Sequence, residues 1–129
     1  MRTNQEIFTH VLRFLRKQGV AAYEDGECRY RTDTGLQCAL GCLIPEYAYD
    51  PKYEGHKVSS LFRNHPHLAN AMQVDKRQSS GLLFRLQNVH DSTLKEFGMG
   101  MWEIEMEEIA EDYNLQFEEN NADQSRNLQ

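Results

Sequence analysis

Apolar residues recur every three or four positions along three stretches of the chain, and this spacing predicts amphipathic helices over 4–18, 79–97 and 101–114. The first stretch follows a capping-box pattern at Thr3 and stops at Gly19, so the helix is expected to begin and end there. The predicted apolar faces consist of Ile7, Phe8, Val11, Leu12 and Leu15, then Leu82, Leu83, Leu86, Val89, Leu94 and Phe97, then Trp102, Met106, Ile109, Ala110 and Tyr113.

The segments between these helices predict shorter elements. Ser79 or Ser80 is the expected cap of the second helix, and a further helix is expected over 66–74. Small and charged residues alternate from Cys28 onward and a turn-forming Thr-Asp-Thr-Gly sequence follows, which predicts a β-hairpin near 28–39. The elements together predict an α+β fold, a mainly helical small domain with one β-hairpin packed on a helical bundle.

The length of 129 residues fits one globular domain, which we place at 1–117, with 118–129 as a polar C-terminal tail that frays. Residues 20–27 are interpreted as a polar connector that leads into the hairpin. Gly41 lies in an apolar run that ends at Pro45, and a glycine there implies close approach of another backbone segment or of a ligand.

The charge pattern separates the last helix from the rest of the chain, although the net charge of −6 is moderate. Ten acids and only one base, Arg126, follow from residue 96 onward; the acids are Glu96, Glu103, Glu105, Glu107, Glu108, Glu111, Asp112, Glu118, Glu119 and Asp123. Such a surface argues against direct nucleic-acid binding, because it repels phosphates. The acidic final helix is either a solvated face or a contact surface for a basic partner.

The three cysteines allow three interpretations. Free cysteines are commonly small buried hydrophobes, which is the favoured interpretation. A metal site would combine Cys28, Cys38 and Cys42 with a histidine, but the spacing lacks the usual paired knuckle, and we predict no metal and no cofactor. A Cys28–Cys38 disulfide is the third, and the odd cysteine count disfavours it.

The candidate ligand-binding residues come from the predicted hairpin, the tyrosine-rich loop after Pro45 and the leucine-rich helix. Arginines suit a phosphate, tyrosines stack on a base, and polar residues on an apolar helix need partners. We expect the hairpin to fold against the leucine-rich helix, so that the two share one polar pocket. The residues are Arg29, Tyr30, Arg31, Tyr49, Gln87, His90 and Asp91.

The chain resembles a family of small proteins from bacteriophages and bacteria to which no activity is attached. The resemblance covers about the middle two thirds of the chain. It is carried by Cys28, Tyr30, Arg31, Gly35, Cys38, Ala39, Gly41, Leu43, Ile44, Pro45, Tyr49, Asp50, Pro51, Glu54, Gly55, Leu86, Gln87, His90 and Asp91. It implies a phage or mobile-element origin and no mechanism, and Cys42 matches no position of the pattern.

The favoured function is a small non-enzymatic binding or inhibitory protein that acts in the cytoplasm of the bacterial host on a host factor, a defence component or a signalling nucleotide. One alternative is an enzyme that pairs Cys28 or Cys38 with His90 and Asp91, although neighbouring residues on a helix diverge by about 100°. The other alternative is a small metal-stapled structural module. The sequence carries no P-loop, metal-hydrolase or nucleophile-elbow motif and does not fix the oligomeric state.

Overall fold

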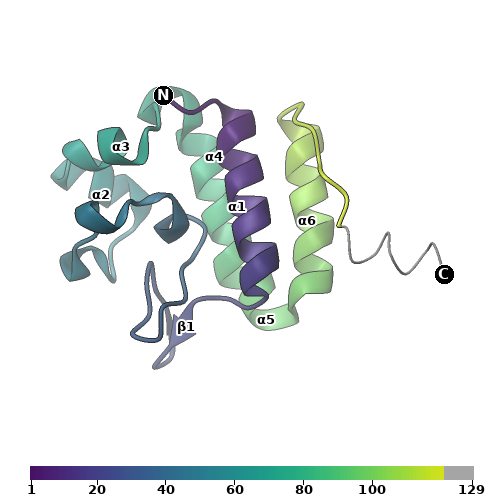
Figure 1. Cartoon of the computed structure of the whole chain (residues 1–129), viewed down its shortest axis with the longest axis horizontal. Helices are drawn as coiled ribbons and strands as arrows, with labels where there is room; N and C mark the ends of the chain where they lie inside the picture. Colours follow the sequence, from purple (N-terminus) through teal and green to yellow (C-terminus); the bar gives the residue numbers. More distant parts are fainter. Residues whose placement is uncertain (121–129) are drawn as a thin grey trace.

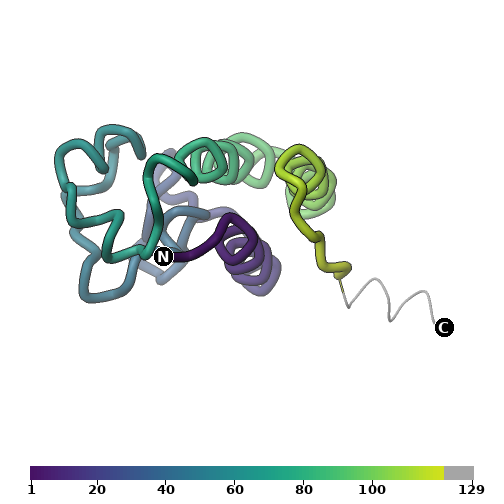
Figure 2. Tube along the Cα trace, turned by 90° about the horizontal axis from the view of Figure 1, so that it is seen from above, coloured from purple at the N-terminus to yellow at the C-terminus, as the bar shows by residue number. Residues whose placement is uncertain are grey.

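Helix α1 (Asn4–Gln18) packs against both α4 (Lys76–Asn88) and α6 (Met99–Asp112) in the computed structural model, which describes residues 1–120. Figure 1 shows the three helices side by side, and the view from above in Figure 2 places α1 in front of the other two. A two-stranded hairpin lies at one end of this bundle (Figure 1). The predicted class, a small and mainly helical α+β domain with one hairpin, is confirmed.

The predicted ends of α1 are confirmed. The Thr3 hydroxyl accepts the amide of Glu6 at 3.1 Å, and the Glu6 carboxylate accepts the amide of Thr3 at 2.9 Å, which completes the capping box. Gly19 follows in the left-handed region with φ of 79°, where glycine carries no steric penalty, and its amide donates to the carbonyl of Leu15. All five predicted core residues of α1 are buried.

The predicted helix over 79–97 begins earlier than expected, at Lys76, and the helical stretch ends at Phe97 as predicted. Asp75 caps α4 by accepting the amides of Arg77 and Gln78, so the helix begins before the predicted serine caps. Ser79 is instead buried, and its hydroxyl donates to the Asn4 side chain at 2.7 Å, which ties α4 to α1. An aspartate can cap as well as a serine, and the earlier residue begins the helix.

After α4 the chain widens into one π-helical turn, η4 (Val89–Leu94), and closes with the short α5 (Lys95–Phe97). Gly98, at φ of 84°, then reverses the chain into α6. Phe97 is 72% exposed and was wrongly placed on the apolar face, because the helix that would carry that face ends here. Trp102, Met106, Ile109 and Ala110 of α6 are buried as predicted.

The hairpin lies earlier in the chain than predicted. Strand β1 (Tyr23–Glu24) pairs with β2 (Glu27–Cys28) in antiparallel register, so the predicted connector contains most of the hairpin. The turn residues Asp25 and Gly26 have φ of 54° and 81°, as a tight two-residue hairpin turn requires, and an Asp-Gly pair is a strong signal for that turn. Residues 29–39 form a loop with one isolated bridge between Arg31 and Gln37.

The chain between the hairpin and α4 runs through several short elements, which lie beside the bundle in Figure 1. They are η1 (Gly41–Leu43), η2 (Glu46–Ala48), η3 (Pro51–Tyr53), α2 (Val58–Asn64) and α3 (His67–Met72). The predicted helix over 66–74 thus corresponds to α3. The close approach predicted at Gly41 is confirmed, because a Cβ there would lie 2.0 Å from the carbonyl oxygen of Tyr30.

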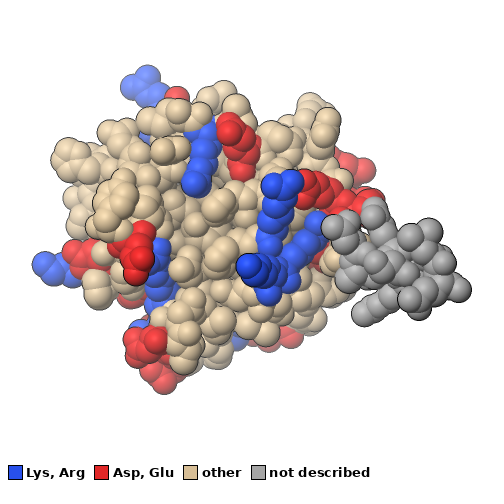
Figure 3. Space-filling model, in the orientation of Figure 1, with Lys and Arg blue, Asp and Glu red and all other residues tan. Residues whose placement is uncertain are grey.

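Two carboxylates of the predicted acidic face of α6 form ion pairs within the molecule. Glu103 forms a two-pronged ion pair with Arg16 of α1, at 2.5 and 2.7 Å, and Asp112 pairs with Arg85 of α4 at 2.7 Å. Figure 3 shows basic and acidic side chains next to one another on the face that carries α1. Glu105 accepts a hydrogen bond from the Thr93 hydroxyl of η4.

The predicted C-terminal tail begins with an ordered contact, since Glu118 forms an ion pair with Arg13 of α1. The remainder of the predicted tail from residue 121 lies outside the described residues. Within residues 1–120, no helix combines the length and the apolar character needed to span a membrane.

Candidate functional site

A pocket of about 640 Å³ lies where the hairpin, the loop before α2 and the helix α4–η4 meet. Strand β2 and the residues after it form one wall, residues 55–59 form a second wall, and α4 with η4 forms the third. The lining residues are Glu27, Cys28, Arg29, Tyr30, Gly55, His56, Lys57, Val58, Ser59, Phe84, Gln87, Asn88 and Asp91. The hairpin segment and the leucine-rich helix therefore share one pocket, and four of the seven candidate residues line it.

His90 lies beneath this pocket and is fully buried. Its Nε2 accepts the backbone amide of Ala22 at 3.0 Å, so Nε2 carries no proton. The proton of the neutral ring is therefore on Nδ1, which donates to Oδ1 of Asp91 at 2.8 Å. Because both ring nitrogens are committed, His90 is a structural link between the helix and the segment before β1, and it does not line the pocket.

Gln87 extends the same network to η1. Its Oε1 accepts the amide of Leu40 at 2.9 Å, and its Nε2 donates to Oδ1 of Asp91 at 2.8 Å. Oδ1 thus accepts two hydrogen bonds, one from Gln87 and one from His90. The carboxylate of Asp91 is held in one orientation, and its side chain remains 43% exposed toward the pocket.

His90 and Asp91 are in contact, although the side chains of neighbouring helical residues diverge by about 100°. Both residues lie in η4, where the backbone winds more widely than an α-helix. The Asp91 side chain reaches back toward the ring and toward Gln87, one turn earlier. The three residues form a hydrogen-bonded group, but the free imidazole nitrogen that a general base needs is missing from it.

The thiols are poor nucleophiles in this environment. Burial and the nearby negative charge of Asp91 raise the pKa of Cys28 to about 12. Burial likewise raises the pKa of Cys38 to about 12 and lifts that of Cys42 as well. All three cysteines are free: Cys38 is fully buried, and Cys28 and Cys42 are partly buried, in agreement with the favoured interpretation.

Cys28, His90 and Asp91 have potential metal-ligand atoms within 4.8 Å of one another, and they form the single such group among residues 1–120. The set differs from the one considered from sequence, which combined all three cysteines. Ligation by His90 would require an unprotonated nitrogen, but Nε2 is the acceptor for Ala22 and Nδ1 carries the proton. The hydrogen bonds therefore oppose a metal at this position.

Two cationic side chains line the pocket, Arg29 from the hairpin and Lys57 from the residue before α2. Arg29 lies 3.7 Å from the carboxylates of Glu24 and Asp25, beyond hydrogen-bond distance, and its buried Nε has no hydrogen-bond partner in the described residues. Both ion pairs are long, so an anionic ligand group that came within hydrogen-bond distance of the guanidinium group would compete with them.

Arg31 and Tyr49 do not line this pocket and form a separate cluster instead. The Arg31 guanidinium donates to the carbonyl of Ile44 at 2.5 Å and lies 4.9 Å above the Tyr49 ring. The Tyr49 hydroxyl donates to Glu54 at 2.6 Å, and Glu54 also accepts the amides of Tyr30 and Arg31. This cluster fixes the path of the loop, which is a structural task.

Sequence reasoning missed several lining residues, above all Lys57 and Phe84. Phe84 is 66% exposed, because it lies outside the buried stripe of α4. A large apolar residue outside the stripe of leucines is a signal in the sequence for a binding surface. Lys57 lies in a loop that only the tertiary fold brings to the hairpin, and no local pattern marks it. Tyr30 lines the pocket as predicted, and its hydroxyl donates to the carbonyl of His56.

Comparison with known proteins leaves the site to be interpreted on its own geometry. No protein-family model, curated protein or solved structure matches the chain.

Proposed function

We propose that this protein is a small non-enzymatic binding protein that holds a nucleotide-sized ligand in the pocket between the hairpin and α4–η4. The observation that carries the proposal is the presence of a preorganised carboxylate, Asp91, and two cationic side chains, Arg29 and Lys57, in the lining of one pocket. The volume of about 640 Å³ lies within the range of about 300–1,000 Å³ that is typical of small-molecule sites.

The chemistry of the walls supports a ligand with groups of both kinds. Arg29 and Lys57 suit a phosphate, whereas Asp91 accepts hydrogen bonds from a base or an amine. The exposed ring of Phe84 adds an apolar surface. The site also adjoins a π-helical turn, a feature that is common at functional sites.

The alternative of a cysteine-dependent enzyme is less well supported. The thiols are protonated at neutral pH, and the imidazole that is grouped with Cys28 and Asp91, that of His90, has both nitrogens hydrogen-bonded. A role in countering a host factor or a defence component, with the phage or mobile-element origin that the sequence pattern implies, would follow if the bound molecule were a signalling nucleotide.

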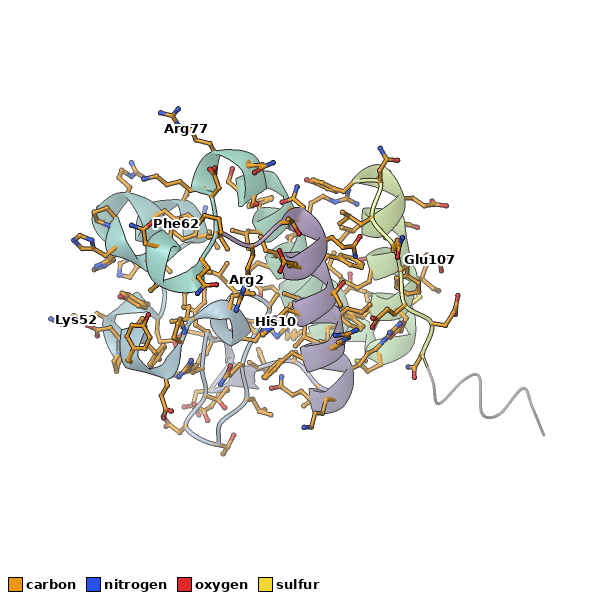
Figure 4. All side chains as sticks on the ribbon, turned by 45° about the horizontal axis from the view of Figure 1, so that its top comes forward. Arg2, His10, Lys52, Phe62, Arg77 and Glu107 are labelled. Carbon is orange, nitrogen blue, oxygen red and sulfur yellow. The ribbon has the colours of Figure 1, made fainter. Side chains whose placement is uncertain are left out.

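Calorimetric titration with a panel of nucleoside monophosphates tests the proposal. Wild-type protein should bind at least one, and the double variant Arg29→Gln/Lys57→Gln should bind it at least about tenfold more weakly, because charged hydrogen bonds are lost. The matched control is Arg77→Gln/Lys52→Gln, which removes the same charges at two side chains that point away from the body of the molecule in Figure 4. Equal losses in both variants, or no binding to the wild type, would refute a phosphate site in this pocket.

A further inference from the structure

The exposed carboxylate of Asp91 defines what the pocket can recognise. Its Oδ1 already accepts from Gln87 Nε2 and His90 Nδ1, each at 2.8 Å, the Cys28 thiol lies beside it, and the side chain remains 43% exposed where it lines the pocket. An ionised carboxylate can only accept hydrogen bonds. The pocket therefore presents an acceptor that is already oriented before any ligand arrives. A hydrogen bond from a ligand to this acceptor costs the protein little conformational entropy.

We propose that the preferred ligand is a nucleotide whose base offers adjacent N–H donors, as guanine does, to the carboxylate of Asp91. The inference rests on the nucleotide-binding function proposed above and adds the identity of the base. Guanine presents N1–H and the N2 amino group side by side on one edge. An acceptor-only carboxylate matches that edge, because every polar atom facing it is a donor.

The other bases fit this acceptor less well. Adenine places the N1 lone pair beside its amino group, and cytosine places N3 in the same relation, so each directs an acceptor at the carboxylate. Uracil has one N–H between two carbonyl oxygens. Sites built to bond a particular edge reject analogues strongly, because the mismatched polar group is left unpaired.

The rest of the pocket sets the orientation of the ligand. With the base at Asp91, the phosphate would lie toward Arg29 and Lys57, which line the same pocket from the hairpin and the α2 side. Glu27 on the rim adds a second negative charge, which disfavours a ligand that is anionic along its whole length. A free amino acid carries both charges but is much smaller than a cavity of about 640 Å³.

The test compares 5′-GMP, 5′-IMP and 5′-AMP by isothermal titration calorimetry. We expect GMP to bind at least about tenfold more tightly than AMP, and IMP, which lacks the N2 amino group, to lie between them. Equal affinities for the three would overturn this inference while leaving the proposed function standing. Failure of all three to bind would overturn both.

Asp91→Asn provides the sharper comparison. In this variant the asparagine oxygen takes the place of Oδ1 and still accepts from Gln87 and His90. The amide nitrogen takes the place of Oδ2 and is a donor, whereas the carboxylate oxygen was an acceptor. The GMP preference should fall at least about tenfold, and AMP should bind as well as GMP or better. Asp33→Asn is the control, an exposed aspartate outside the pocket lining that should leave all affinities unchanged. An unchanged GMP preference in Asp91→Asn would contradict the inference. If the variant does not fold, the relative affinities of the wild-type protein for GMP, IMP and AMP decide the inference.

Discussion

His90 binds the backbone of Ala22, 68 residues earlier in the chain, through a hydrogen bond of 3.0 Å that lies entirely within the core. The bond attaches the segment that enters the hairpin to the π-helical turn. A buried amide that loses its acceptor keeps its desolvation cost, so the imidazole stabilises the fold by more than its packing. The pocket depends on this attachment, because its two main walls meet at this point.

Replacing His90 by phenylalanine should therefore lower the free energy of unfolding by about 1–3 kcal/mol, since the Ala22 amide loses its acceptor. Urea denaturation followed by circular dichroism measures the loss. His67→Phe at an exposed position of α3 serves as the control and should change stability little. Equal stability of the two variants would show that the buried bond contributes nothing.

Gly41 should not tolerate a side chain. An alanine Cβ would lie 2.0 Å from the Tyr30 carbonyl oxygen, and the clash is with backbone, so Gly41→Ala should destabilise the protein by about 3 kcal/mol or more. Gly100→Ala is the matched control, because open space surrounds that position in α6 and alanine favours the helix by about 0.5–1 kcal/mol. Thermal unfolding of both variants would decide, and a neutral Gly41→Ala would place Tyr30 elsewhere.

The two arginines of α1 that pair with C-terminal acids should differ in effect. The Arg16 side chain is 13% exposed and binds Glu103 with two bonds, whereas Arg13 is 67% exposed in its pair with Glu118. We expect Arg16→Met to cost on the order of 2 kcal/mol and Arg13→Met clearly less, because water screens the outer pair. Denaturant titrations in low and high salt measure both, and a larger loss for Arg13→Met would contradict this ranking.

The thiols should be unreactive in the native protein. The pKa values of Cys28 and Cys38, raised by burial to about 12, leave little thiolate at pH 7.5, so a disulfide reagent should modify both much more slowly than in the unfolded chain. A single fast-reacting cysteine at pH 7.5 would revive the enzyme alternative.

The same shifts predict how stability depends on pH. A thiol whose pKa is higher in the folded state than its ordinary value of 9.0 contributes stability that is fully present below pH 9 and is lost as pH rises toward 12, because the unfolded chain ionises first. Burial of Tyr30 and Tyr49 raises their pKa values in the same direction. The urea concentration at the midpoint of unfolding should therefore decrease as the pH is raised from about 9 to about 11. A midpoint that stays constant across that interval would contradict the burial of these groups.

The sequence predicted the features that depend on local periodicity and capping. The capping box at Thr3, the stop at Gly19 and the buried stripe of α1 are examples. It also predicted that the helix with Gln87 and Asp91 shares a pocket with the hairpin segment, because polar residues beside an apolar stripe need partners. The hairpin lies earlier in the chain than the alternating pattern after Cys28 predicts, because its turn is formed by Asp25 and Gly26.

Other features could not be reached without the fold. No local pattern predicted the π-helical turn, in which His90 and Asp91 are hydrogen-bonded to one another. Lys57 reaches the pocket only because the loop returns to the hairpin. Arg31 and Tyr49 suit a ligand by residue type, yet the structure occupies both with Glu54 and the Ile44 carbonyl.

Backbone amide NMR of ¹⁵N-labelled protein titrated with 5′-GMP tests the account most directly. Binding in the proposed pocket predicts saturable shift changes at residues 27–30, 55–59 and 84–91, with little change on the exposed face of α6. Saturable shifts confined to α6, or a spectrum that GMP leaves unaltered, would contradict it.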